Sequence, residues 1–308
     1  MKILIVGAGG IGGYFGGRLA EFGCDVTFLV RSERKKSLDA TGITVTSPLG
    51  DIKRRVPSIL LSDLNDDFDV VFIACKSYHL PQVVSDLKSR NLKKAYYLPL
   101  LNGLGHIAVL DNVFGADKVL GGLCRIAATL TPEGGIVHLG KFAEIRIGSR
   151  SAAGSVVAGQ MVGLFQGAGV SAVYADDIMY EMWSKFVDLS TLAAATCTMR
   201  APIGIINRAA AGSTFVSALI DEAASVSAAS GYQIQDQKLD NTRRLLSDET
   251  STLTSSMLRD LESGGLIEAE HIIGDLCDRG RALGVSTPFF DIARSHLQAY
   301  EMRSLAGG

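Results

Sequence analysis

The chain has 308 residues, with 30 Lys and Arg against 32 Asp and Glu, and a net charge of −2. This balance excludes the strong basic field that attracts nucleic acid or an anionic membrane surface. The length exceeds what one hydrophobic core usually holds, so we expect two domains. No apolar run of 18 residues and no export signal is found, so the sequence predicts a cytoplasmic protein.

The cysteines and histidines argue against a metal site. The five cysteines are widely scattered, form no CxxC pair and fall mostly within apolar runs, which is typical of reduced core residues in the cytosol. The five histidines lack the spacing of metal ligands, so we expect each at the surface or in the core and no metal cofactor.

An apolar strand runs directly into a glycine-rich turn near the start of the chain. Ile3–Val6 shows no period-2 alternation, which is typical of a parallel strand buried on both faces. The glycines that follow have GxGxxG spacing, which allows a tight turn, close approach of the backbone to a pyrophosphate, and close helix packing. The expected phosphate-binding residues are Gly7, Ala8, Gly9, Gly10, Ile11 and Gly12.

The context of this motif favours a dinucleotide site over a glycine-rich turn with no ligand. A helix is predicted over 11–22 and a second apolar strand over 26–30, which completes a βαβ unit. The amino terminus of the helix would offer N–H groups and a positive dipole end to the phosphates.

The residue after the second strand indicates which dinucleotide binds. An acidic residue there would accept hydrogen bonds from the ribose 2′-hydroxyl of NAD, but this chain has Arg31, which suits the 2′-phosphate of NADP. The sequence therefore predicts NADPH as the cofactor. Ser32, Arg34 and Lys35 lie close by and could assist. The alternative is that Arg34, Lys35 and Lys36 are only the solvated face of the next helix.

The remaining pattern predicts a doubly wound sheet followed by a helical domain. From about Asp176 the apolar residues recur at helical spacing, so we place a Rossmann-type domain at 1–175 and an all-helical domain at 176–308, an arrangement like that of 6-phosphogluconate dehydrogenase. The Ala- and Ser-rich helices could bury one another within a chain or in a homodimer. Further strands are predicted at 70–74, 95–98, 119–127, 135–139 and 144–147, the last three as antiparallel edge strands of the same sheet, with helices at 80–87 and 155–165.

Two polar residues follow predicted strands of the first domain. Lys76 comes directly after strand 70–74, and Asn102 comes after strand 95–98. Ligands of open α/β sheets bind beyond the carboxyl ends of the strands, so both residues are candidates for contact with cofactor and substrate. The alternatives are a solvated loop lysine and an Asn-Gly turn.

Several motifs along nearly the whole chain resemble the ketopantoate reductases, which use NADPH to reduce 2-dehydropantoate to pantoate on the pantothenate pathway. The resemblance implies that Arg31 and Lys76 bind NADPH and that Asn102 lies at the nicotinamide and the substrate. It also implies that Lys185 is the general acid and that Ser256 and Glu268 complete the substrate site, with Glu268 either orienting the lysine or binding a substrate hydroxyl. The motifs are GAGGIGG at 7–13, ACKSY at 74–78, LNGLG at 101–105, EMWSKF at 181–186, RAPIG at 200–204 and SSMLRDLESGGLIEAE at 255–270.

The chemistry of the reaction makes these roles sensible. Hydride delivery to a 2-oxo carbon builds negative charge on the carbonyl oxygen, and a lysine ammonium can both stabilise that charge and donate the proton. The small-molecule partner is therefore expected to be a 2-oxo acid.

The chain departs from the family pattern beside Lys185. Leu189 and Ala193 stand where the resemblance leads us to expect asparagines, one and two turns further along the same helix face, and Ile203 and Leu253 replace two others. Asp188 either replaces a lost amide or pairs with Lys185. The sequence thus leaves two alternatives to 2-dehydropantoate reduction: reduction of a more apolar 2-oxo acid, and a non-catalytic NADP-binding regulatory module.

Overall fold

The computed structural model describes residues 1–306, which form two compact units. The first unit holds residues 1–101 and 106–179, and the second holds residues 102–105 and continues from Tyr180. Residues 307 and 308 of the predicted second domain lie outside the described residues. The predicted α/β fold, with a parallel sheet followed by a helical part, is confirmed.

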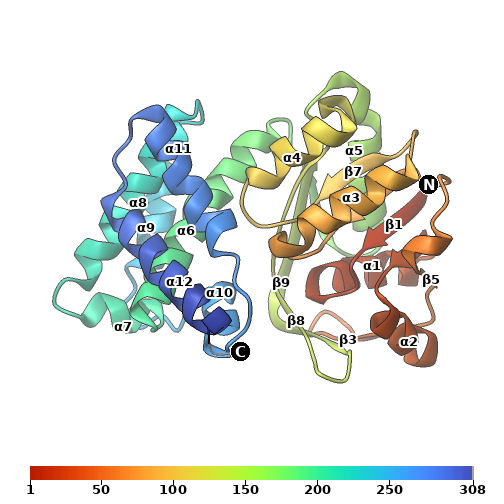
Figure 1. Ribbon diagram of the computed structural model, residues 1–308, viewed down its shortest axis with the longest axis horizontal. Coiled ribbons are helices and arrows are strands. Elements are labelled where there is room, and N and C mark those ends of the chain that lie inside the picture. The colour runs from red at the N-terminus through yellow and green to blue at the C-terminus, as the bar shows by residue number, and fades with distance from the viewer. Residues whose placement is uncertain (307–308) are drawn as a thin grey trace. The chain divides into compact units, whose positions relative to one another are not determined.

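The first unit is built on a five-stranded parallel sheet in the order β5-β2-β1-β6-β7. Strands β1, β5 and β7 of this sheet are labelled in Figure 1. The central strand β1 (Lys2–Val6) is buried on both faces, which explains its unbroken apolar sequence. The strand order reverses at β1, so the crevice for a ligand lies where β1 ends. The other strands are β2 (Asp25–Leu29), β5 (Ser58–Ile59), β6 (Val70–Ile73) and β7 (Tyr96–Pro99).

Helix α1 (Gly10–Phe22) anchors the core of this unit. Tyr14, Phe15 and Leu19 are buried among residues of β1 and β2, and the Phe15 ring packs edge-on against Phe165 of α5 with centroids 5.7 Å apart. This contact joins helices that are far apart in the sequence. The other helices of the unit are α2 (Ser32–Thr41), α3 (Leu80–Arg90), α4 (Gly105–Phe114) and α5 (Ser155–Gly167).

The prediction of antiparallel strands that extend the first sheet is wrong, because these strands form a second sheet. β9 pairs antiparallel with β8 and parallel with β3 and β10. The predicted strands 135–139 and 144–147 are parts of the single strand β9. Strand β3 lies about 90 residues before β9 and β10 about 30 residues after it, so no local sequence pattern reveals that they pair with β9. The strands are β3 (Ile43–Thr46), β4 (Ile52–Arg54), β8 (Gly121–Leu130), β9 (Ile136–Gly148) and β10 (Ser171–Tyr174).

In its described residues the second unit consists of helices and the loops between them, with no strand. Its longest helix, α6 (Ile178–Met199), buries Trp183, whose ring stacks on Tyr232 with centroids 5.6 Å apart. A π-helical turn, Glu270–Gly274, leads into α11 (Asp275–Leu283) and is called the π-turn below. The remaining helices are α7 (Ile203–Arg208), α8 (Gly212–Ala229), α9 (Asp236–Leu246), α10 (Ser256–Glu262) and α12 (Pro288–Ala306).

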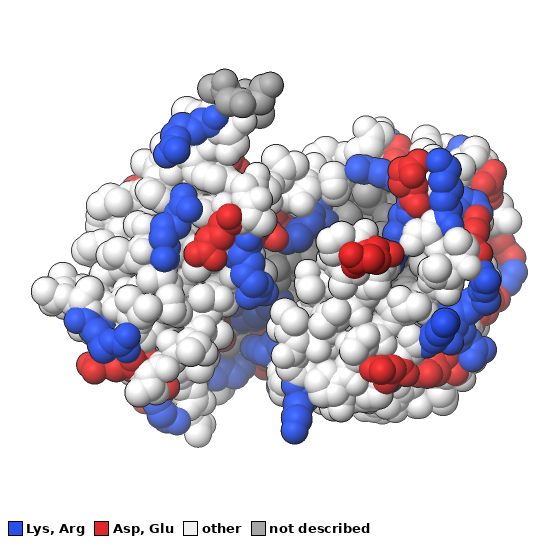
Figure 2. All heavy atoms as spheres, turned by 90° about the horizontal axis from the view of Figure 1, so that it is seen from below, with Lys and Arg blue, Asp and Glu red and all other residues white. Residues whose placement is uncertain are grey.

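Charged side chains of both signs are mixed on the surface. Figure 2 shows basic and acidic side chains interspersed over the face that it presents. Within residues 1–306, no helix combines the length and the apolar character that crossing a bilayer requires. Those residues also contain no group of three or more His, Cys, Asp or Glu that could hold a metal ion.

Candidate active site

The glycine-rich turn follows β1 directly. Gly7 adopts φ +96°, a left-handed conformation that favours glycine, and its N–H donates to Leu29 of the neighbouring strand. A Cβ on Gly12 would lie 2.0 Å from the carbonyl oxygen of Gly7, whereas a Cβ on Gly9 would meet nothing within 4 Å. The turn is therefore closely packed at Gly12 and has open space at Gly9.

This open space fits the pyrophosphate of a dinucleotide. Gly9 is the N-cap residue of α1 and offers no side-chain oxygen to the helix, so the first N–H groups of α1 are available to an anion. The residues predicted from the sequence to bind phosphate thus form a backbone cradle at the carboxyl end of the central strand.

Arg34 supports this cradle from outside, a role that sequence reasoning missed. Its Nε donates to the carbonyl of Ala8 at 3.0 Å, and its Nη1 donates to the carbonyl of Gly134 at 2.7 Å. The alternative that Arg34 is only part of the solvated face of α2 is therefore wrong. Lys35 and Lys36 instead pair with Asp39 and Glu33 of their own helix.

Arg31 and Lys76 also follow strands of the parallel sheet. Arg31 is exposed after β2, and its Nη2 lies 3.2 Å from Nδ1 of His79. Burial and the charge of Arg31 both lower the pKa of His79, so the ring is neutral near pH 7. Lys76 is half-buried after β6, and its carbonyl accepts the N–H of His79. His79 therefore links the segments that carry the two predicted cofactor-binding cations.

The second unit brings Lys185 and Asn102 together. Lys185 lies on α6 and Asn102 on the loop after β7, and Nζ of the lysine donates to Oδ1 of the asparagine at 3.1 Å. The sequence placed Asn102 in the first domain, but the structure groups residues 102–105 with the helical unit. The physical reason is that this short loop packs on His271 of the π-turn.

Glu268 and Ser256 lie at opposite ends of the segment that contains α10. Glu268 is 6% exposed, and its carboxylate opposes the lowering of the His271 pKa that burial causes. Ser256 is the first residue of α10. The hydroxyl of Ser255, the N-cap of α10, accepts the N–H of Leu258 at 3.0 Å and lies 2.8 Å from the Thr196 hydroxyl of α6. These bonds fix the start of α10 to the helix that carries Lys185.

The wall of α6 beside Lys185 is apolar. Leu189 is half-buried and Ala193 is fully buried, one and two turns after the lysine. Asp188 accepts a hydrogen bond from the Thr242 hydroxyl at 2.5 Å. This bond ties the Asp188 carboxylate to α9.

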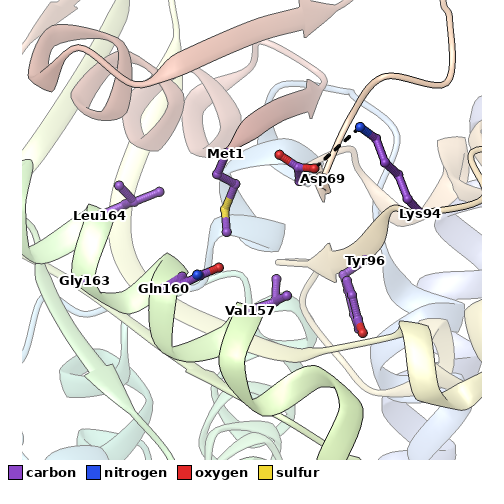
Figure 3. Close-up of a pocket in the computed structure, with 8 residues that line it drawn as sticks. All are labelled: Met1, Asp69, Lys94, Tyr96, Val157, Gln160, Gly163 and Leu164. Carbon is purple, nitrogen blue, oxygen red and sulfur yellow. Dashed lines mark ion pairs between the residues drawn. The ribbon is translucent and has the colours of Figure 1, made fainter.

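A separate cavity of about 570 Å³ lies in the first unit (Figure 3). Val157, Gln160 and Leu164 of α5 line one side of it, and the other side includes Met1 and an ion pair of Lys94 with Asp69. This cavity lies at the amino ends of β1, β6 and β7. Ligands of doubly wound folds bind at the opposite edge of the sheet, beyond the carboxyl ends of the strands. The cavity is therefore separate from the predicted site.

Comparisons with known proteins decide the family. Models of the ketopantoate reductase PanE/ApbA and of its C-terminal part match residues 3–152 and 177–301. The chain belongs to the ketopantoate reductase family. Its resemblance to that family, inferred from the sequence, is thereby confirmed, and as a member it is an oxidoreductase.

Relatives match nearly the whole length of this chain. An uncharacterized oxidoreductase, YkpB, of Bacillus subtilis (strain 168) is 33% identical over 98% of this chain and 99% of its own. A 2-dehydropantoate 2-reductase of Streptococcus pyogenes serotype M3 is 26% identical over 94% of each chain. A PanE/ApbA family ketopantoate reductase from Ralstonia eutropha JMP134 superposes with a TM-score of 0.89, 25% identity and coverage of 99% of this chain and 100% of its own.

Proposed function

We propose that this protein uses NADPH to reduce a 2-oxo acid to the 2-hydroxy acid, with 2-dehydropantoate as the leading substrate and Lys185 as the general acid. The observation that carries this proposal is the hydrogen bond from Lys185 Nζ to Asn102 Oδ1, in a chain of this reductase family. When bound, the reduced nicotinamide supplies a hydride to the carbonyl carbon. The glycine turn, Arg31 and Lys76 are the proposed cofactor-binding residues.

Lys185 completes the reaction in this proposal. An ammonium has three donors, and one of them is directed to Asn102; in this proposal the substrate also accepts hydrogen bonds from Nζ. The carbonyl oxygen accepts one of these bonds, gains negative charge as the hydride arrives, and then takes the proton from Nζ. Ser256 would bind the substrate carboxylate, and Glu268 would bind a substrate hydroxyl or orient the lysine.

A second candidate substrate is a 2-oxo acid with an apolar side chain. Leu189 and Ala193 favour it, because a buried hydroxyl that finds no partner costs about 1–3 kcal/mol. Turnover of NADPH with 2-dehydropantoate and with its analogue that lacks the hydroxyl separates the two candidates. Activity with neither would reject both candidate substrates.

The role of Lys185 is tested with Lys185→Ala, and Lys88→Ala, an exposed lysine on α3, is the matched control. We expect kcat to fall about 10²–10⁴-fold in the first variant and to stay unchanged in the second. Near wild-type turnover by Lys185→Ala would exclude this lysine as the acid.

The preference for NADPH is tested with Arg31→Ala and calorimetric titration of both cofactors. Loss of a charge-assisted bond of about 1.5–3 kcal/mol should raise the Kd for NADPH about 10–100-fold and leave NADH binding nearly unchanged. Equal wild-type affinity for NADH and NADPH would contradict the proposed role of Arg31.

A further inference from the structure

The loop Asn102–Gly105 packs around the ring of His271. A Cβ on Gly103 would lie 2.9 Å from the His271 carbonyl oxygen and 3.1 Å from ring atom Cδ2, and a Cβ on Gly105 would lie 3.7 Å from Cε1. Gly103 also has φ +81°, so the backbone turns sharply at this contact. The loop that presents Asn102 therefore rests on the imidazole along most of its length.

His271 is bonded to this loop and not only in contact with it. The ring forms a hydrogen bond with the backbone of Asn102. Burial lowers the pKa of His271, while the neighbouring carboxylates of Glu268 and Asp275 oppose that effect. Asp275 is itself held by Arg279, whose Nε donates to it at 2.9 Å. A neutral imidazole keeps one N–H donor for the Asn102 carbonyl.

The π-turn that carries His271 is fixed from its other side. Arg294 of α12 donates from Nη2 to Glu270 at 2.6 Å and from Nη1 to Asp278 at 2.7 Å. A Cβ on Gly274 would lie 2.6 Å from the Glu270 carboxylate, so the ion pair occupies the space that a side chain would take. Turns of this type occur frequently at functional sites.

We propose that His271 is a positioning residue: it holds the backbone of Asn102 so that Oδ1 of that residue stays within hydrogen-bond reach of Lys185 Nζ. The inference rests on the proposed role of Lys185 as the general acid. Loops are mobile unless they are tied down, and a small displacement of a catalytic group reduces turnover strongly. His271 provides this tie, three residues after Glu268 in the sequence.

The test compares three variants. His271→Phe keeps a ring but removes the donor, His271→Asn restores a short donor, and His296→Phe changes an exposed histidine of α12 as the control. We expect kcat to fall about tenfold or more in His271→Phe, with the Kd for NADPH unchanged, and to recover partly in His271→Asn. If His271→Phe does not fold, His271→Ala carries the same test, because it also removes the donor.

A double-mutant cycle with Asn102→Ala separates positioning from general packing. If His271 acts through Asn102, the loss of its donor should reduce kcat no further once Asn102→Ala is present. Losses that multiply, or wild-type kcat in the single variant, would overturn the proposal.

A spectroscopic measurement keeps this inference separate from the proposed function. The side-chain amide of Asn102 can be assigned in a ¹⁵N spectrum by its disappearance in Asn102→Ala. It should shift in His271→Phe and not in His296→Phe. This result is expected even if the wild-type protein reduces no 2-oxo acid, an outcome that would reject the proposed function alone, while an unshifted amide would reject the role of His271.

Discussion

The two units contribute different kinds of chemical group to their candidate sites. In the sheet unit the site is mostly backbone, shaped by glycines within six residues of one another. In the helical unit it consists of side chains that meet from distant positions, as Lys185 and Asn102 do across 83 residues. A backbone site depends on the absence of side chains, whereas a side-chain site depends on partners that hold each group in place. Substitutions should therefore damage the two units in different ways.

The largest effect is expected from Gly12→Ala in the sheet unit. The new Cβ would overlap the Gly7 carbonyl, so we expect a loss of about 3 kcal/mol or more in unfolding free energy, together with loss of NADPH binding. Chemical denaturation and calorimetry measure the two quantities.

Gly9→Ala is the matched control, because its Cβ meets no protein atom. It should leave stability unchanged and weaken only the binding of NADPH. Equal stability of the two variants would show that the cradle is not shaped by backbone packing.

The next largest effect is expected from Arg34→Met. This variant tests whether the backbone site of the sheet unit also depends on a side chain. It removes the bonds to Ala8 and Gly134, and a hydrogen bond to a charged group contributes about 1.5–3 kcal/mol. We expect an unfolding free energy lower by about 2 kcal/mol and weaker NADPH binding. Lys36→Met, which removes an exposed pair, should change neither measurement; an equal change in both variants would mean that the contact with the glycine turn is unimportant.

A smaller effect is expected from Ser255→Ala in the helical unit. Loss of an N-cap costs about 1 kcal/mol, and the start of α10 would also lose its bond to Thr196. Because Ser256 is proposed to bind the substrate carboxylate, KM should rise more than kcat falls. Ser263→Ala, at the exposed end of α10, serves as the control, and an unchanged KM in Ser255→Ala would separate the cap from substrate binding.

The smallest effect is a dependence of stability on pH. The pKa of His271 is lowered in the folded protein from its usual value of 6.5, so the unfolded chain binds this proton more readily. The contribution of His271 to stability is thus present above pH 6.5 and is lost as the pH falls towards the lowered pKa, with a slope of at most about 1.4 kcal/mol per pH unit. Denaturation midpoints between these limits should vary less with pH in His271→Phe than in the wild type or in His296→Phe. Identical slopes would contradict the burial of this ring.

Much of the sheet unit could be predicted from the sequence because its signals are local. The apolar run of β1, the glycine spacing and Arg31 after β2 all lie within 31 residues of the start. The pairing of β9 with β3 and β10 was missed, because register between distant strands leaves no periodicity in either segment. Arg34 was misjudged in the same way, since one of its partners, Gly134, lies 100 residues away.

From residue patterns alone, without the family resemblance, only the secondary structure of the helical unit could be predicted. Lys185 was identified through family resemblance, because a lysine on a helix is usually a surface residue whose stem lies along apolar neighbours. His271 was missed altogether. The one available signal was its position three residues after Glu268, which places two polar side chains on one face if the segment is helical.

The grouping of residues 102–105 with the helical unit has a consequence for engineering this protein. A gene fragment that begins at the junction near residue 176 would encode His271 without the loop that packs on it. Chimaeras that exchange the carboxy-terminal half between relatives would likewise combine a loop and a π-turn that were not selected together. Successful recombination should therefore transfer residues 102–105 along with the helices, as a discontinuous module.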